Sequence, residues 1–251
     1  RSRIESLLQD PALVQETTSA LNMIRRSPNQ SATTARFQAG LLARFLFSCL
    51  VDGDRSDTAA FLEPGEADLR QGGKYIPWQL LSERVEAHLS DLGRDNSAVS
   101  VLRRKVSDAC LEGASRHSGV YTLTVPTGGG KTLASLRFAL HHASRLNLER
   151  VIYVSPYLSI IDQNAKVIRD VLESNEDAQS TVVLEHHSNL TPHADTRLAR
   201  LLAENWDAPV VCTTTVQFLE TLFGSGTRAV RRMHQLARSV IVFDEIQTLP
   251  V

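Results

Sequence analysis

The chain has 251 residues, of which 42% are hydrophobic and 22% are charged, and its formal net charge is −1. This composition is that of a soluble globular protein, long enough for one large domain or for one domain and part of another. It excludes a membrane protein, because no apolar run approaches the roughly 20 residues that a membrane span needs. The three cysteines are widely separated in apolar surroundings, which favours reduced core residues of a cytoplasmic protein.

The first hundred residues predict helices joined by loops. Apolar residues recur at helical intervals over residues 1–26, and they form a strongly apolar helix face over residues 34–51. Glycines and prolines over residues 62–77 predict a loop or linker. The apolar spacing over residues 78–92 and 99–110 predicts two further helices.

From residue 119 onward, the pattern changes to strands that alternate with helices. The expected strands are short apolar runs rich in β-branched residues, at 120–125, 151–155, 181–184, 209–213 and 239–243. Helical patterns fill the gaps between them, at 131–146, 159–173, 195–205, 214–223 and 227–237. This alternation predicts an α/β fold with a parallel sheet and helices on both faces.

A glycine-rich loop follows the first expected strand and leads into a helix. The glycines permit a tight turn whose backbone N–H groups face phosphate oxygens, and the helix N-terminus adds a favourable partial charge. Lys131 can reach the β- and γ-phosphates of a nucleotide, and the Thr132 hydroxyl can ligate Mg²⁺. Val125 stands where the strict form of this motif has its first glycine. The segment predicts a site for ATP and Mg²⁺, with contacts from Thr127, Gly128, Gly129, Gly130, Lys131 and Thr132.

Two carboxylates follow the last expected strand. An acid at the carboxyl end of a buried parallel strand is where an α/β sheet places its ligand chemistry. We expect Asp244 to hold Mg²⁺ and Glu245 to activate the attacking water, so that Glu245 and Lys131 are the catalytic residues. Alone, the two acids could equally be solvated residues of a turn. The phosphate-binding loop on the same chain makes the nucleotide site the favoured interpretation.

The two motifs together resemble the first RecA-like domain of a superfamily 2 helicase, a P-loop NTPase with a DEAD/DEAH-type second motif, here Asp-Glu-Ile-Gln. Residues 151–164 resemble motif Ia of that family, and residues 210–220 resemble its Ib region. The resemblance implies contacts with the backbone of single-stranded DNA. The candidate residues for these contacts are Pro156, Ser159, Gln163, Thr213, Thr214 and Thr215. The alternative for the three threonines is that they cap a helix.

Three segments carry a narrower resemblance: residues 159–163 (Ser-Ile-Ile-Asp-Gln), residues 184–188 (Leu-Glu-His-His-Ser) and the Asp-Glu-Ile-Gln motif. Together they resemble the CRISPR-associated helicase–nuclease of type I interference systems. In that family an HD-type, metal-dependent DNA nuclease precedes a 3′-to-5′ DNA helicase, and the partner is an RNA-guided CRISPR surveillance complex. Residues 47–58 resemble the end of the nuclease domain, although Gly53 replaces the family's alanine. The resemblance implies that Asp54, or alternatively Asp52, is a ligand of a divalent transition metal.

The same resemblance divides the chain into three parts. Residues 1–62 would be the C-terminal part of an α-helical HD-type nuclease domain, 63–95 a linker and connecting helix, and 96–251 the first RecA-like ATP-binding domain. The histidines of an HD cluster are missing, and no second RecA-like domain with an arginine finger follows Val251. We therefore expect an internal fragment that binds Mg²⁺ and ATP but hydrolyses ATP only feebly. The parent enzyme would hydrolyse ATP, unwind DNA and cleave it.

Two other functions compete with this interpretation. One is a generic superfamily 2 helicase or restriction-type translocase without a nuclease, and the other is a nucleotide-binding scaffold that does not hydrolyse ATP. The intact set of Lys131, Thr132, Asp244 and Glu245 argues against the scaffold. We expect structural roles for most of the other aromatic, histidine and basic side chains. Trp78 and Trp206 are expected to pack, and His141 and His142 to pack or to lie at the surface. The basic residues are expected on solvated helix faces: Arg103, Arg104, Lys105, Arg231 and Arg232. A contribution of Arg231 and Arg232 to a DNA path is the alternative, and His186 and His187 receive no role.

Overall fold

The computed structural model describes residues 9–25, 31–63, 65, 72, 74–92, 97–174, 181–187 and 197–248. The helical pattern expected over residues 1–8, most of the expected linker between residues 64 and 73, and Ser188 lie outside the described residues. Within the described part of the chain, no helix has both the length and the apolar character that crossing a membrane requires.

Four parallel strands form the sheet, in the order β2-β3-β1-β4. Their bounds are β1 (Arg150–Ser155), β2 (Val183–His186), β3 (Val210–Thr214) and β4 (Ser239–Phe243). Every residue of the two inner strands, β1 and β3, is buried, whereas β4 lies at the edge and is half-buried. The predicted parallel sheet is confirmed, because these four strands match four of the five expected runs within two residues at each end.

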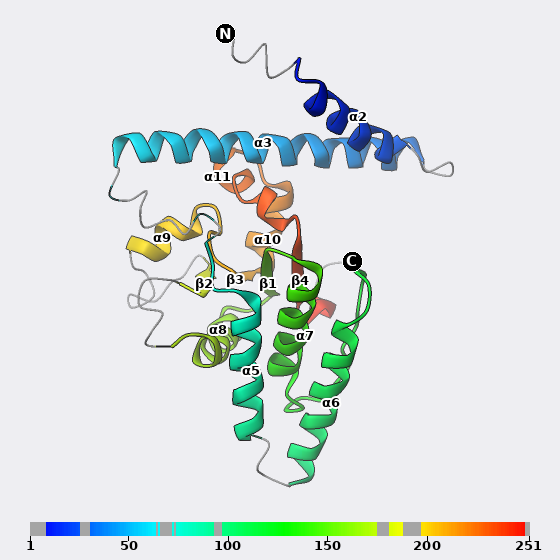
Figure 1. The fold of residues 1–251 in the computed structure, drawn as a ribbon, viewed down its shortest axis with the longest axis vertical. Coiled ribbons are helices and arrows are strands. Elements are labelled where there is room, and N and C mark those ends of the chain that lie inside the picture. Colours follow the sequence, from blue (N-terminus) through cyan, green and yellow to red (C-terminus); the bar gives the residue numbers. More distant parts are fainter. Residues whose placement is uncertain are drawn as a thin grey trace.

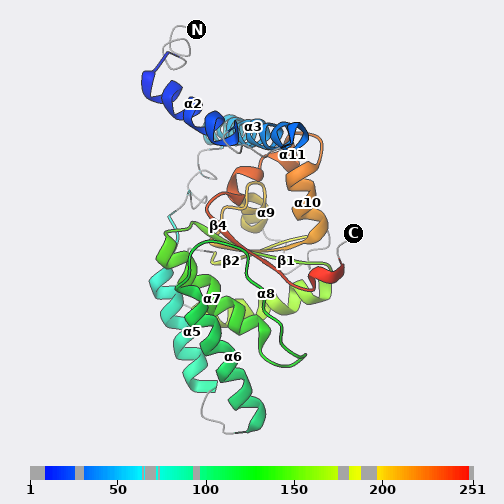
Figure 2. The ribbon, with the colours of Figure 1, turned by 90° about the vertical axis from the view of Figure 1, so that its right-hand side faces the viewer.

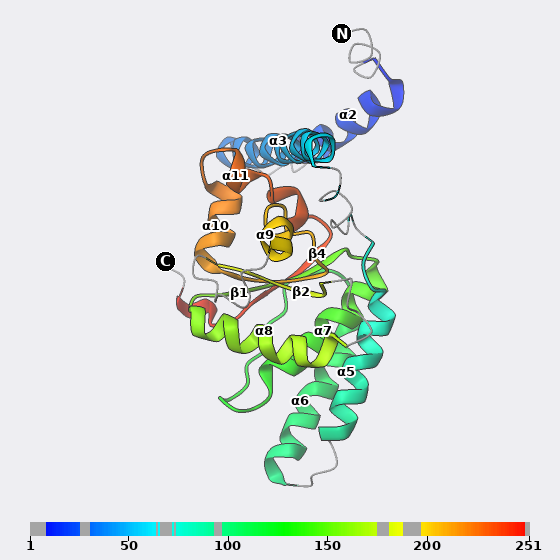
Figure 3. The same cartoon turned by 90° about the vertical axis from the view of Figure 1, so that its left-hand side faces the viewer.

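Helices cover both faces of the sheet (Figure 2). One face packs against α5 (Trp78–Leu92), α7 (Lys131–Leu146) and α8 (Leu158–Leu172), and α6 (Ala98–Ala114) packs on α7. The other face packs against α9 (Arg197–Ala203) and α10 (Thr215–Phe223) (Figure 3). Successive residues of β1 alternate between the two cores, since Val151 belongs to the first and Ile152 to the second. The predicted α/β architecture is therefore confirmed.

Residues 120–125 do not form a strand, so the prediction of a fifth strand there is wrong. Val120 is 98% exposed, and Tyr121 packs against Phe138 and His142 of α7 instead of entering the sheet. A β-branched, apolar composition favours a strand only where a neighbouring strand supplies hydrogen bonds and cover. Within the described residues, β4 ends the sheet and no further strand pairs with it.

The N-terminal part of the described chain is helical. It comprises α2 (Pro11–Arg25) and the 31-residue helix α3 (Ala32–Leu62), which continues through the segment 52–58. Figure 1 shows α3 lying across one end of the molecule, over α11 (Thr227–Val230) and near the 3₁₀ helix η2 (Met233–Leu236). Cys49 on α3 is exposed, which corrects the expectation that all three cysteines are core residues; Cys212 is buried.

The single helix expected over residues 227–237 is replaced by α11, a turn and η2. The turn buries Arg231 and Arg232, so the prediction that they lie on a solvated helix face is wrong. Arg231 forms ion pairs with Asp52 (2.6 Å) and Glu204 (2.7 Å), and the Arg232 guanidinium lies over the ring of Trp206. Because Arg231 is paired and Arg232 is stacked, both guanidinium groups are buried in the protein and are not exposed to a DNA strand.

Candidate functional site

The glycine-rich loop owes its shape to three glycines with two different roles. Gly128 (φ 79°) and Gly130 (φ 81°) adopt left-handed backbone conformations that side chains with a Cβ rarely take. Gly129 does not have a positive φ, but a Cβ there would lie 2.3 Å from Cγ1 of Val125. Val125, which departs from the strict motif, is therefore accommodated because residue 129 lacks a side chain.

The loop ends where α7 begins, at Lys131. Gly130 is the N-cap residue and no side chain caps the helix, so the N–H groups of the first turn are available to a ligand. An uncapped helix N-terminus with its partial positive charge suits a phosphate group. Arg103 of α6 donates a hydrogen bond from Nε to the carbonyl oxygen of Gly128 (2.9 Å). The sequence suggests only a solvated basic helix face for this residue. This hydrogen bond connects the loop to α6.

Asn164 connects the two residues that were predicted to bind Mg²⁺. The Thr132 hydroxyl donates to Oδ1 of Asn164 (3.0 Å), and Nδ2 of Asn164 donates to Oδ2 of Asp244 (3.1 Å). Asp244 is fixed at the end of β4 because its N–H donates to the carbonyl of Val154 on β1 (2.9 Å). A hydroxyl and a carboxylate are oxygen ligands of the kind that Mg²⁺ prefers, with water and phosphate completing its coordination. The residues present therefore fit this ion.

Lys131 and Glu245 face each other across the same site. Lys131 Nζ lies 3.6 Å from Glu245 Oε1, and both side chains are about one-third exposed. Glu245 has a φ of 54°, unusual for a residue with a side chain, and its carbonyl accepts from the N–H and the hydroxyl of Thr248 (3.0 and 2.9 Å). Thr248 ends the 3₁₀ helix η3 (Ile246–Thr248). Since exposed ion pairs contribute little stability, Lys131 can exchange the carboxylate for a phosphate at small cost.

The residues predicted to contact nucleic acid are not equally accessible. Ser159 and Gln163 are exposed on α8, and Pro156 and Thr215 are half-buried. Thr213 is fully buried and donates to the carbonyl of His186 (2.8 Å). The hydroxyl of Thr214 accepts from the N–H of Gln217 (3.0 Å) and caps α10, so the alternative of a helix cap holds for this residue.

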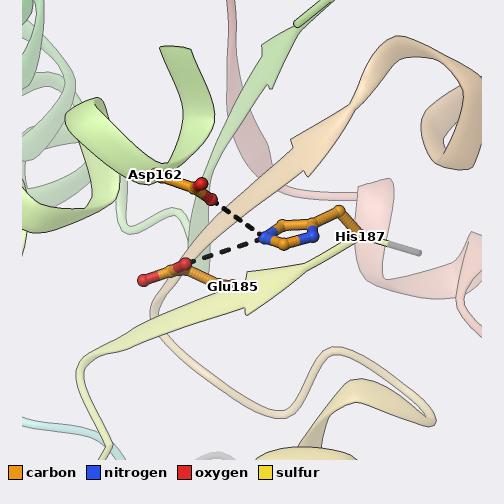
Figure 4. Close-up of side chains that lie close together, drawn as sticks. All are labelled: Asp162, Glu185 and His187. Atoms are coloured by element: carbon orange, nitrogen blue, oxygen red, sulfur yellow. Dashed lines mark ion pairs between the residues drawn. The ribbon is translucent and has the colours of Figure 1, made fainter. Parts of the chain in front are cut away.

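His187 lies in a cluster with Asp162 of α8 and Glu185 of β2 (Figure 4). Its Nε2 atom is 3.2 Å from Oδ1 of Asp162 and 3.8 Å from Oε2 of Glu185, and its side chain is 2% exposed. Glu185 also pairs with Arg169 (2.6 Å). The contact with the Glu185 carboxylate, followed by the charge of Asp162, raises the pKa of His187 even though burial opposes this shift. His187 thus connects Asp162 of α8 with Glu185 of β2, and this contact is strongest when the ring is protonated.

His186, the neighbour of His187 in sequence, shows the opposite shift of pKa. Burial, and then the positive charge of Arg232, lowers the pKa of His186 to about 3, so the ring is neutral at physiological pH. It packs edge-on against Trp206. The structural roles expected for Trp206 and for His142 are confirmed, since Trp206 is fully buried and His142 stacks on Phe138.

The two candidate metal ligands on α3 differ in environment. Asp52 accepts a hydrogen bond from Nε of Arg231 (2.6 Å), and its Oδ2 lies 3.3 Å from Nδ2 of Asn205 and 3.4 Å from Nε2 of His234. Asp52 therefore anchors α3 to the rest of the structure. Asp54 is exposed, and among the described residues it belongs to no group of three or more potential metal ligands.

Comparison with known proteins gives two findings. The sequence model of the DEAD/DEAH box helicase family matches residues 103–250, a range that contains both the glycine-rich loop and Asp244. The sequence is also 29% identical over 170 residues to a Haloferax volcanii protein described as "CRISPR-associated nuclease/helicase Cas3". That match covers 59% of this chain and 18% of the relative's length.

Proposed function

Because the chain belongs to the DEAD/DEAH box helicase family, we propose that it binds ATP and Mg²⁺ where loop 126–132 meets the end of β4. The observation that carries the proposal is the convergence of Thr132 and Asp244, far apart in the sequence, on the single side chain of Asn164. Lys131 and Glu245, 3.6 Å apart, lie beside them. A hydroxyl, a carboxylate, a lysine and uncapped N–H groups together match a triphosphate and its cation.

Each residue then has a defined task. The N–H groups of the loop and of the first turn of α7 bind phosphate oxygens, apart from that of Gly129, which donates to the carbonyl of Pro126 (3.0 Å). Lys131 leaves Glu245 to contact the β- and γ-phosphates. Thr132 and Asp244 hold Mg²⁺, which neutralises charge on the transferred phosphate group. Glu245, released from Lys131, orients the attacking water and accepts its proton.

We further propose that the protein acts on single-stranded DNA and couples ATP hydrolysis to movement along it. Support comes from Ser159 and Gln163, whose exposed polar side chains stand one turn apart on the helix that also carries Asn164. Hydroxyl and amide groups can donate to backbone phosphates without reading the base sequence. Pro156 and Thr215 are secondary candidates, whereas the buried hydroxyl of Thr213 is not used.

The likeness to the Haloferax relative supports a role in CRISPR interference, with an RNA-guided surveillance complex as partner in the cytoplasm. In this proposal residues 1–62 belong to an HD-type nuclease domain, 63–95 form a linker and connecting helix, and 96–251 form the helicase domain. Large apolar side chains of α3 are exposed, as expected of one helix of a larger helical domain: Phe47, Leu50, Phe61 and Leu62. The exposed Asp54 is the proposed ligand of a transition metal, whose preference for imidazole requires histidines from elsewhere in that domain.

A translocase without nuclease activity is the second candidate. The observation that favours it is the engagement of Asp52 by Arg231, Asn205 and His234, which gives this carboxylate a structural role. Metal-dependent cleavage of single-stranded DNA by a longer form of the protein, abolished by Asp54→Ala, would decide for the nuclease.

Nucleotide binding can be tested on the chain itself. We expect a fluorescent ADP analogue with Mg²⁺ to bind the wild type, and Lys131→Ala to weaken binding by about tenfold or more, since a charge-assisted contact contributes about 1.5–3 kcal/mol. Lys166→Ala, which removes an exposed lysine of α8, is the matched control and should bind normally. Failure of the wild type to bind, or equal binding by Lys131→Ala, would contradict the proposal.

ATP turnover by the chain alone should be feeble, because related enzymes complete the site with an arginine from another domain or protein.

A further inference from the structure

Asn164 is a polar residue on the buried face of α8. The residues around it on this face, Ile161, Ala165 and Ile168, are core residues, and Asn164 itself is only 8% exposed. A buried side-chain amide is tolerated where its donor and acceptor both have partners. Here those partners are Thr132 and Asp244, and sequence reasoning did not identify Asn164 as part of the site.

The directions of the two hydrogen bonds determine which atoms remain for a cation. Thr132 gives its hydroxyl proton to Oδ1 of Asn164, so the lone pairs of the Thr132 oxygen point elsewhere. Asn164 Nδ2 donates to Oδ2 of Asp244, which leaves Oδ1 of that carboxylate without this partner. One amide therefore holds a hydroxyl and a carboxylate in place while leaving an oxygen of each for ligation.

We propose that Asn164 is a positioning residue that orients Thr132 and Asp244 toward one Mg²⁺ ion. This inference rests on the proposed function and adds a residue from a third element to the nucleotide site. Only asparagine and glutamine carry a donor and an acceptor on one planar amide, and glutamine is longer by one methylene. Residues that hold metal ligands in place, without touching the metal, tune its affinity.

The position of Asn164 also connects the cation ligands to the proposed nucleic-acid contacts. Ser159 and Gln163 are on the same helix, on its exposed side, and Gln163 is the neighbour of Asn164 in sequence.

The test compares the affinity of a fluorescent ADP analogue in Mg²⁺ with its affinity in EDTA, for the full chain and its variants. For Asn164→Ala and Asn164→Leu, the gain in affinity that Mg²⁺ provides should fall by about tenfold or more. Affinity in EDTA should stay within about twofold of wild type, because the phosphate-binding loop is untouched. Asp170→Asn removes an exposed carboxylate from the same helix and should preserve the Mg²⁺ gain.

The outcomes separate this inference from the function on which it rests. A wild type without Mg²⁺-dependent binding would refute the proposed nucleotide site itself. A wild type with such binding, and variants that keep its full Mg²⁺ gain, would overturn only the role of Asn164. Equal losses in Mg²⁺ and in EDTA would indicate a structural effect and also overturn it. Asn164→Leu nearly preserves the side-chain volume, so the test remains decisive if Asn164→Ala does not fold.

Discussion

At residue 129 of the glycine-rich loop there is no room for a side chain, because Val125 packs against it. We predict that Gly129→Ala opens the loop, because the new Cβ would lie 2.3 Å from Val125 Cγ1 and 3.0 Å from the carbonyl oxygen of Pro126. Overpacking of this kind costs about 1–3 kcal/mol. Nucleotide affinity should therefore fall, together with a modest drop in the thermal unfolding midpoint.

Gly119→Ala is the matched control for this substitution. A Cβ at residue 119 would meet no heavy atom within 4 Å, so both nucleotide affinity and the unfolding midpoint should be unchanged. Equal affinities of Gly129→Ala and wild type for the ADP analogue would show that the loop adapts to the methyl group, contrary to this account.

Among single residues, sequence motifs predict some members of the candidate site and miss others for physical reasons. Lys131 and Asp244 follow from local patterns, since a loop before a helix and an acid after a buried strand are recognisable along the chain. Asn164 could have been noticed as a polar residue on the apolar face of an amphipathic helix, but its partners are remote in sequence. Thr213 and Thr214 look alike in sequence, and only the fold separates a buried hydroxyl from a helix cap.

At the scale of elements, periodicity and composition predict what is decided locally. The helix expected at 131–146 is α7 with the same bounds, and the strand expected at 239–243 is β4. Residues 120–125 have a similar composition but form no strand, because pairing depends on neighbours that are distant in the chain. The helix expected over 227–237 is interrupted where Arg231 and Arg232 turn inward to partners contributed by other elements.

The junction of α8 and β2 carries a pH-dependent contribution to stability. Glu185 and Asp162 raise the pKa of His187 in the folded protein. Arg169 is the other charged group beside the cluster, and it pairs with Glu185. A raised folded-state pKa stabilises the protein fully below the unfolded pKa of about 6.5, and this contribution is lost as pH rises through the folded value. We therefore predict that His187→Gln destabilises the protein more at about pH 5.5 than at about pH 8.5.

Urea unfolding at the two pH values measures this difference. His117→Gln changes an exposed histidine outside this cluster and is the matched control. An equal or larger destabilisation by His187→Gln at the higher pH would mean that protonated His187 does not join the two elements.

At the scale of the whole molecule, α3 is held to the sheet domain by polar contacts. The central contact is the ion pair of the buried Arg231 with the half-buried Asp52, and Arg231 also binds the exposed Glu204. Nearby, Ser48 bonds to His234 (3.0 Å), and Arg44 donates to the carbonyl of Gly224 (2.6 Å). Residues 47–58, which resemble the end of a nuclease domain, therefore contact Arg231 and His234 in the part of the chain that follows β3.

Removing one partner from a fully buried ion pair costs about 3–5 kcal/mol. Asp52 is half-buried and keeps Asn205 and His234, so we expect a value near the lower end of this range for Arg231. We predict a loss of this size in the free energy of unfolding for Arg231→Met, together with faster proteolysis within α3. Asp57→Asn alters an exposed carboxylate of the same helix and should change stability by no more than about 0.5 kcal/mol. If Arg231→Met were as stable as wild type, α3 would have to be anchored by its apolar contacts instead.

The most direct test of the central claim is a crystal structure of the chain grown with ADP and Mn²⁺ in place of Mg²⁺. Anomalous scattering would locate the metal without reference to any assumed site. We expect a metal peak bonded to the Thr132 hydroxyl and the Asp244 carboxylate, with the diphosphate against the free N–H groups of residues 127–132. A metal bound elsewhere, or nucleotide absent from this loop at saturating concentration, would contradict it.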